Sequence, residues 1–125
     1  MSNATFTSGA IGFDVAQTIE KFTLVALNAD EKLVPATAAG PVFGAVTEPG
    51  SLNEDPRVDG NDILAVSYGQ HAVKIRTDED IKAGAAVFAA DDGKAASTGT
   101  VQVGVAARRT RKGLVVVVLN SCPNA

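Results

Sequence analysis

Residues 24–32 read LVALNADEK and residues 86–94 read AVFAADDGK, so an apolar run followed by turn residues and a lysine occurs twice. Each segment predicts a strand, a turn and a returning strand, because Val and Phe favour strands while Asn, Asp and Gly favour turns. Further along, residues 42–45 (VFGA) line up with residues 101–105 (VQVGV), each around a glycine. These alignments predict two similar β-units, with chance as the alternative because Ala, Val and Gly are so frequent.

The remaining sequence also predicts strands and few helices. Pro35 cannot donate a backbone hydrogen bond, so its strand belongs at a sheet edge or ends there. Residues 63–77 predict a hairpin with Gly69-Gln70 as its turn, since residues 71–77 alternate apolar and polar side chains. Residues 78–84 predict one helical turn that ends at glycine. The expected strands are residues 22–27, 33–36, 42–47, 63–68, 71–77, 85–89, 94–97, 100–106 and 114–119.

Length and composition favour one all-β domain. The chain has 125 residues, of which 46% are hydrophobic, and Ala and Val dominate that fraction while Trp is absent. Small and β-branched residues suit a thin β-type core rather than a helical bundle. We therefore expect residues 21–125 to form a single β domain, with at most one or two short helical turns. Residues 1–20 are polar and small, and we expect them to form an extended N-terminal arm.

Charge and residue counts exclude several classes of function. The net charge of −3 argues against a nucleic-acid binder, which would normally be basic. One His and one Cys cannot build a clustered metal site, and no catalytic or nucleotide-binding motif is present. No apolar run approaches the length of a membrane span, and the first residues do not resemble a signal peptide. We expect a protein made in the cytoplasm, with no metal, cofactor or small-molecule substrate.

Two oppositely charged segments are candidate docking sites. Arg108, Arg109, Arg111 and Lys112 place four cations within five residues, whereas residues 48–62 carry five carboxylates and one arginine. The basic run is either a solvated turn or a patch that docks on an acidic protein surface. Because both charges occur on one chain, residues 48–62 of a neighbouring copy are one possible partner.

Three single residues have ordinary structural interpretations. Lys94 follows Asp92-Gly93 at an expected hairpin, where lipoyl and biotinyl carrier domains present a modified lysine, but a solvated turn lysine also fits. His71 shares a strand face with Val73 and Ile75, as a structural histidine would. Cys122 lies near the end of the chain and requires no role.

Several segments, in this order along the chain, resemble those of a known family. They are Thr5-Phe6-Thr7, residues 32–36 (KLVPA), residues 40–46 (GPVFGAV), residues 62–75 with Tyr68-Gly69-Gln70 at a turn, residues 83–88 (AGAAVF) and residues 103–106 (VGVA). Together they are similar to the lambda-type phage head decoration proteins, also called capsid cement proteins. The acidic segment and the basic run have no counterpart in that family.

The resemblance implies a small barrel of the β-clip or β-tulip type that assembles as a homotrimer. It also implies a virion protein that binds the major capsid protein at local three-fold sites on the capsid exterior and stabilises the shell, without catalysis. Thr5, Phe6 and Thr7 would form a capsid-binding arm, because strand-forming residues can add to an exposed sheet edge with Phe6 as an apolar anchor. The alternative is a small binding or carrier module that uses Lys94.

Overall fold

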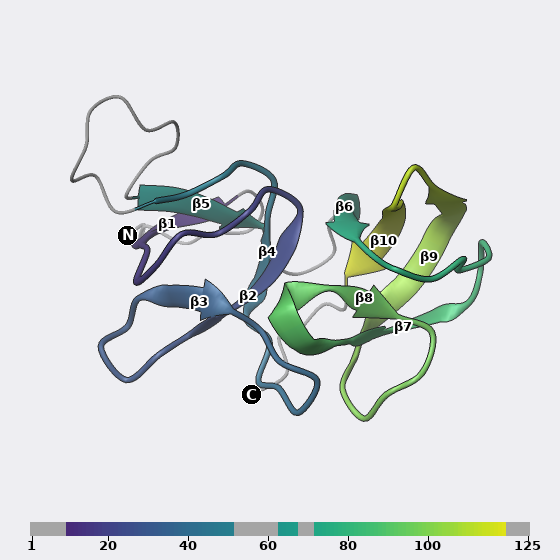
Figure 1. Cartoon of the computed structure of the whole chain (residues 1–125), viewed down its shortest axis with the longest axis horizontal. Helices are drawn as coiled ribbons and strands as arrows, with labels where there is room; N and C mark the ends of the chain where they lie inside the picture. Colours follow the sequence, from purple (N-terminus) through teal and green to yellow (C-terminus); the bar gives the residue numbers. More distant parts are fainter. Residues whose placement is uncertain (1–9, 52–62, 68–71, 120–125) are drawn as a thin grey trace, which may run out of the picture.

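The structure is a computed structural model that describes residues 10–51, 63–67 and 72–119. The described chain forms ten strands and one short 3-10 turn, η1, so the expected all-β class is confirmed (Figure 1). The elements are β1 (Ala10–Asp14), β2 (Thr23–Leu27), β3 (Leu33–Pro35), β4 (Gly44–Val46), β5 (Ile63–Ser67), β6 (Ala72–Arg76), β7 (Ala86–Ala89), η1 (Asp91–Gly93), β8 (Ala95–Ala96), β9 (Gln102–Arg111) and β10 (Leu114–Leu119). The finer expectation of a β-clip barrel stays a prediction.

The strands form two five-stranded antiparallel sheets that lie side by side along the long axis (Figure 1). The first sheet has the order β1-β5-β4-β2-β3, and the second has the order β6-β10-β9-β7-β8. Adding five to each strand number converts the first order into the second. The chain is therefore two consecutive units of one topology, which we call the N-terminal repeat (β1–β5) and the C-terminal repeat (β6–β10).

The strand registers confirm the predicted repeat residue by residue. Val25 pairs with Gly44 between β2 and β4, and Val87 pairs with Gly104 between β7 and β9. The hairpins that follow are closed by matching 2.9 Å bonds, in which the amides of residues 28 and 90 donate to the carbonyls of residues 32 and 94. Matching parallel bridges link residues 15 and 33, and residues 77 and 95. A residue of the N-terminal repeat and its equivalent in the C-terminal repeat differ in residue number by a fixed offset within each strand. The offset is 62 for β1 to β3, 60 for β4 and 51 for β5.

The two central glycines have the same structural role. A Cβ atom on Gly44 would collide with the carbonyl oxygen of Ser67 on β5, and one on Gly104 would collide with the carbonyl oxygen of Val118 on β10. Because β5 and β10 are equivalent strands, each repeat brings the backbone of its last strand against a glycine. Only a residue without a side chain permits this approach.

The buried apolar residues form two clusters that differ in how the repeats contribute to them. The inner face of the N-terminal sheet, with Val25, Leu64 and Val66, forms a small core of its own. The equivalent inner face of the C-terminal sheet joins a larger cluster that also contains Leu24 and Ala26 from the opposite, outer face of the N-terminal sheet. The N-terminal repeat therefore packs its outer face onto the core of the C-terminal repeat.

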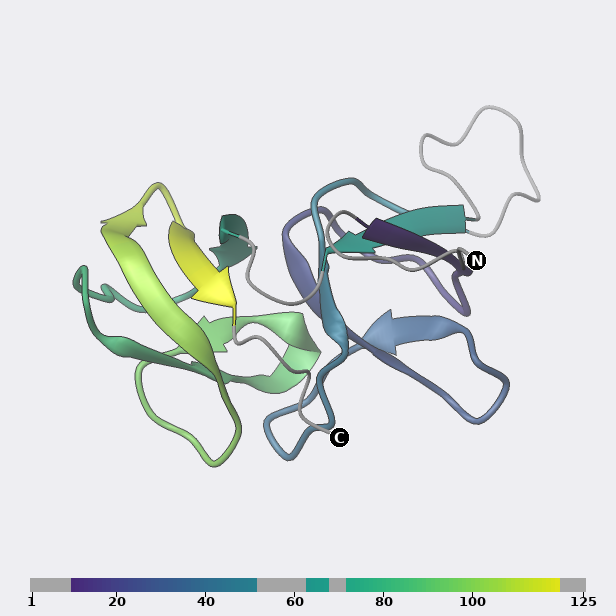
Figure 2. The ribbon, with the colours of Figure 1, turned by 180° about the vertical axis from the view of Figure 1, so that it is seen from behind.

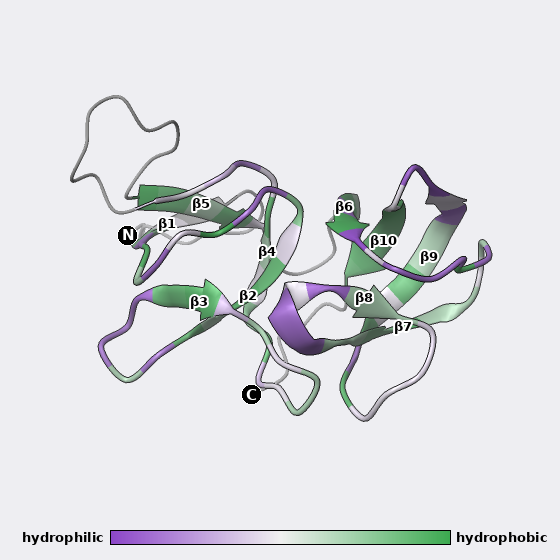
Figure 3. Ribbon diagram, viewed as in Figure 1, coloured by the Kyte–Doolittle hydropathy of each residue, from purple (hydrophilic) through white to green (hydrophobic). Residues whose placement is uncertain are grey.

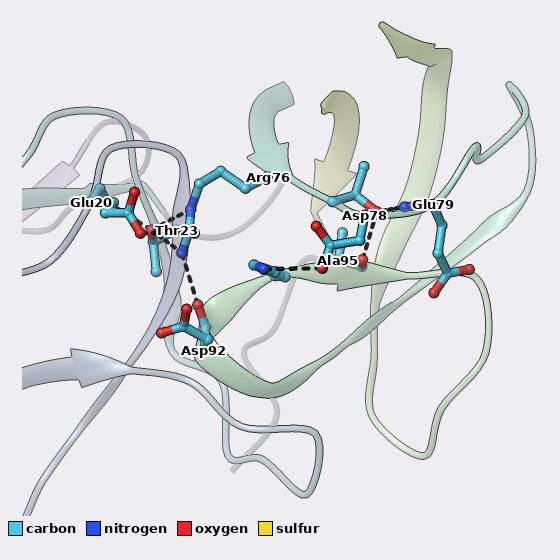
Figure 4. Close-up of polar contacts among 9 residues, drawn as sticks. Glu20, Thr23, Arg76, Asp78, Glu79, Asp92 and Ala95 are labelled. Carbon is cyan, nitrogen blue, oxygen red and sulfur yellow. Dashed lines mark hydrogen bonds and ion pairs between the residues drawn. The ribbon is translucent and has the colours of Figure 1, made fainter. Parts of the chain in front are cut away.

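Arg76, at the end of β6, links the two repeats by hydrogen bonds (Figure 4). Its Nε and Nη2 atoms donate to Thr23 Oγ1 at 3.2 and 3.0 Å, and Nη1 lies 3.0 Å from Glu20 Oε2. Nη2 also donates to the carbonyl oxygen of Asp92, at 2.8 Å. The backbone amide of the same residue donates to the Phe22 carbonyl at 2.9 Å. One side chain therefore joins β6, the start of β2 and η1.

The described residues contain no helix in 78–84, where a helical turn was predicted, but a turn at Lys82–Ala85 with Gly84 at a φ of 87°. The predicted hairpin over residues 63–77 is also wrong. β5 pairs with β1 and β4 in the first sheet, whereas β6 pairs with β10 in the second. An alternating pattern indicates that one face of a strand is buried, but it does not identify the partner strand. The expected edge position of the strand that contains Pro35 is confirmed, since β3 ends the first sheet.

The expected boundary between arm and domain at residue 20 needs a correction. Ala10–Asp14 forms β1, and Val15 and Ile19 are buried in the N-terminal core. The folded unit thus includes residues 10–20, because β1 is the N-terminal counterpart of β6. The segment contains only scattered apolar residues, so no periodic pattern marked it as a strand.

Candidate docking surfaces

The basic run forms the end of a hairpin rather than an irregular turn. Arg108, Arg109 and Arg111 lie on β9, which extends five residues beyond the predicted end of this strand, and Lys112 lies in the turn to β10. Lys112 and Gly113 have φ values of 55° and 76°, as the tight turns of two-residue hairpins require. Figure 3 shows the hydrophilic tip of this hairpin beyond the apolar β10. The four cations are brought together as the sequence indicates.

Arg109 differs from its neighbours because it has a carboxylate partner. Its Nε atom donates to Asp80 Oδ1 at 2.9 Å, and Nη2 contacts Asp80 Oδ2. The hydrogen bonds from the guanidinium lower the pKa of Asp80, and the carboxylate in turn raises the pKa of Arg109. Both side chains are exposed, so water and salt weaken the pair. Arg109 is therefore neutralised locally, while Arg108, Arg111 and Lys112 have no ion pair with the described residues.

The three unpaired cations border a groove with an apolar floor on the outer face of the C-terminal sheet. Val116 of the central strand β10 is paired with Lys74 of β6 on one side and with Arg108 of β9 on the other. Leu114, two residues before Val116 on β10, is paired with Arg111. These residues line one groove together with the hairpin turn. The arrangement suits a partner that combines carboxylates with apolar side chains.

Sequence reasoning did not find Lys74, Leu114 or Val116 as members of this surface. The alternation of residues 71–77 does place Lys74 on the face opposite Val73 and Ile75, and the burial pattern of β6 agrees with it. The pairing of β6 with β10, which the predicted hairpin did not indicate, brings Lys74 beside the basic run.

Thr5, Phe6 and Thr7 lie outside the described residues, as do His71 and Cys122. The first described residue, Ala10, begins β1, which is an edge strand of the first sheet. The proposed arm would therefore continue from an edge of the folded unit.

Lys94 lies beyond η1 in the connection from β7 to β8. Its Nζ atom is 3.0 Å from Asp78 Oδ2, and 31% of its side chain is exposed. A carrier lysine has to project freely from a hairpin tip, whereas Lys94 forms an ion pair with Asp78 in the segment that follows β6. The described geometry favours the interpretation as an ordinary turn lysine.

Within residues 10–51, 63–67 and 72–119, no group of three or more His, Cys, Asp or Glu side chains is placed to hold a metal ion. Over the same residues, no helix has the length and apolarity needed to cross a membrane. In this part of the chain every buried side-chain polar atom also has a hydrogen-bond partner. The charged hairpin and the groove are thus the chemically distinctive features of the described surface.

Comparison with known proteins identifies the fold. No model of a known protein family matches the chain, and no curated protein matches it. Among solved structures, the chain is similar to the N base of the head fiber gp8.5 of bacteriophage phi29, with a TM-score of 0.66 and 19% identity, over 93% of this chain and 97% of that one. It is also similar to the pre-mature gene product 12 of phi29, with a TM-score of 0.52 and 18% identity. The second likeness covers 96% of this chain but only 23% of the other. The chain therefore shares its fold with the N base of the phi29 head fiber over nearly the whole length of both chains.

Proposed function

We propose that this chain is a structural protein of a phage virion that binds the exterior of the capsid, as the base of a fibre or as a decoration protein. The observation that carries the proposal is the fold shared with the phi29 head-fiber base over nearly the whole length of both chains. The resemblance of several segments to head decoration proteins points to the same location. The proposed role is mechanical, and no catalysis or cofactor is part of it.

In this proposal the protein binds the major capsid protein as a homotrimer at local three-fold sites. Contacts that exist only on the mature shell would stabilise that shell by mass action, and three chains held together would gain from avidity. The proposed contacts are the arm, with Thr5, Phe6 and Thr7, and the basic hairpin, with Arg108, Arg111 and Lys112. Arg109 contributes less to such docking than its neighbours, since Asp80 already pairs with it.

The test of the proposal is co-sedimentation of the purified protein with expanded, undecorated capsids of its phage. We expect the wild type to pellet with the shells at a fixed ratio to the major capsid protein, and to raise the temperature at which the shells break. Deletion of residues 2–9 should remove most of the binding, and Phe6→Ala should remove part of it. This deletion stops before β1, so it removes none of the described residues. A wild type that neither pellets with the shells nor stabilises them contradicts the proposal.

A second pair of variants tests the basic hairpin. The double change Arg108→Glu with Arg111→Glu should weaken capsid binding and flatten its dependence on salt. Lys21→Glu with Lys32→Glu is the matched control, because it makes the same charge change at exposed positions of the N-terminal repeat. Equal binding by both double variants would leave the hairpin as a solvated turn.

A further inference from the structure

Equivalent positions on the outer faces of the two sheets differ in burial. Leu24, Ala26 and Ala45 of the N-terminal repeat are 0%, 7% and 0% exposed, because the C-terminal repeat covers them. Their counterparts in the C-terminal repeat are Ala86, Phe88 and Val105. Ala86 and Phe88 are only half-buried, and Val105 is 42% exposed. The C-terminal repeat therefore has the same kind of apolar outer face, but no described residue covers it fully.

At the ends of the inner cores the difference in burial is reversed, because here the residues of the C-terminal repeat are the more deeply buried ones. Ile75, Ala89 and Val103 of the C-terminal repeat are buried in the cluster that includes the outer face of the N-terminal repeat. Their counterparts are the larger Phe13, Leu27 and Phe43, which are only partly buried at the margin of the N-terminal core. The rings of Phe13 and Phe43 meet edge to face with centroids 5.3 Å apart. Among residues 10–51, 63–67 and 72–119, no sheet face covers this end of the N-terminal core as the N-terminal repeat covers its counterpart.

The contact between the repeats is consequently heterologous, with the outer face of one repeat on the core end of the next. Each chain uses one outer face and one core end internally, and the part of the chain that the structure describes covers the other outer face and the other core end only in part. Figures 1 and 2 both show β1 and β3 toward one end of the molecule and β9 toward the other. The two remaining surfaces therefore belong to elements at opposite ends of the molecule and do not meet within a chain.

We propose that copies of this chain associate head to tail through these surfaces, repeating between chains the contact that joins the two repeats within a chain. Ala86, Phe88 and Val105 of one copy would cover the end of the core formed by Phe13, Leu27 and Phe43 in the next. A heterologous contact closes into a ring when the rotation between units allows it, and otherwise extends into a filament. The proposal rests on the repeat and not on the phage assignment.

The charged residues supply an independent argument for a second copy as the partner. Glu20 and Arg76 form the ion pair of the internal contact, with Glu20 on the outer-face side and Arg76 on the core side. The equivalent residues are Lys82 and Asp14, so the pair recurs with both charges reversed. Lys82 and Asp14 are exposed and form no ion pair with the described residues. Head-to-tail association would bring Lys82 of one copy to Asp14 of the next.

The experiment is sedimentation equilibrium of the purified full chain, without capsids, on the wild type, Asp14→Lys, Lys82→Asp and the double variant. We expect the wild type to exceed the 12.7 kDa of one chain, and each single variant to weaken association about tenfold or more. The double variant should recover most of that loss, since it restores opposite charges. Glu48→Lys is the matched control for Asp14→Lys, because it makes the same charge change at an exposed position outside both proposed contact surfaces, and it should associate as the wild type does.

Val105→Asp tests the apolar part of the interface and should also weaken association about tenfold or more. Because Val105 is exposed, the variant should keep the circular dichroism spectrum of the wild type. A wild type that stays monomeric at high micromolar concentration overturns the proposal. So does an assembled wild type whose association is unchanged in Val105→Asp and in both single charge variants. Failure of capsid binding with association intact would overturn only the proposed function.

Discussion

The N-terminal and C-terminal repeats share one topology but retain few identical residues. Identity persists where the shared fold demands it, as in the inner-facing Val25 and Val87, in the buried Ile19 and Ile81, and in the central glycines. Residues differ where the neighbours differ. Leu24 is covered by the other repeat and its counterpart Ala86 is not. The comparison teaches that the internal geometry of a repeat constrains its inner face, while its position in the chain determines what its outer face contacts.

The connections between equivalent strands differ most of all. β9 and β10 are joined by the tight basic hairpin, whereas β4 and β5 are separated by residues 47–62, which are rich in carboxylates. A common topology therefore carries opposite charges at corresponding places. The connections thus differ in length and charge although the strands that they join are equivalent, as expected when the shared framework is structural and the connections carry function.

The largest expected effect comes from changes that should damage both repeats alike. Gly44→Ala and Gly104→Ala would each place a Cβ atom against a carbonyl oxygen of the adjacent strand. Backbone cannot move aside as a flexible side chain can, so each variant should lose about 3 kcal/mol or more of stability. Urea unfolding of both variants measures the loss.

The control for both glycine changes is Gly12→Ala on the exposed β1. The nearest atom to its new Cβ would be an Ile63 side-chain carbon at 3.5 Å, so stability should be unchanged or slightly increased. If only one of Gly44→Ala and Gly104→Ala were destabilising, the two glycines would not be structurally equivalent.

An intermediate effect should distinguish the repeats. Arg76→Gln removes the charged hydrogen bonds to Thr23 and Glu20, and the side chain is only 19% exposed. We expect it to lose roughly 2 kcal/mol of stability, because Thr23 would keep a buried hydroxyl with fewer partners. Asp14→Asn, at the equivalent position of β1, should leave the stability of the isolated chain unchanged. Thermal unfolding at low protein concentration compares the two, and equal losses would contradict the asymmetry of the contact.

Much of the fold could be predicted from local sequence, and the reason is visible in particular residues. Apolar runs such as residues 114–119 and turn residues such as Asp92-Gly93 mark strands and turns without knowledge of their partners. The alignment of residues 24–32 with residues 86–94 anticipated the repeat because the inner-facing valines and the closing lysines recur. β1 escaped prediction, since its Gly and Asp obscure any period-2 pattern.

The candidate site was only partly predictable, because its members meet through pairing between distant segments. The four cations are adjacent in sequence and could be found together. The partner of Arg109 could not be found in this way, since Asp80 lies 29 residues away in the segment between β6 and β7, which only the fold brings near. Lys74 became part of the groove through the pairing of β6 with β10, which alternation alone does not specify.

The smallest expected effect concerns the ion pair of Asp80 with Arg109, which has no counterpart among the described residues of the N-terminal repeat. The folded state lowers the pKa of Asp80 through its hydrogen bonds with Arg109, so the pair stabilises the fold at pH values above the ordinary carboxyl pKa of 3.8. That stabilisation should be lost as the pH falls through the lower pKa of the folded state. Because both side chains are well exposed, the effect should be smaller than that of Gly44→Ala, Gly104→Ala or Arg76→Gln. Asp80→Asn should therefore be slightly less stable than the wild type near neutral pH, and the difference should shrink in strong acid and in high salt. A double-mutant cycle with Arg109→Gln, measured by chemical denaturation at several pH values, isolates the pair from the many other carboxylates. A coupling energy that persists in strong acid, where both forms of residue 80 are uncharged, would show that the contact acts by packing rather than by charge.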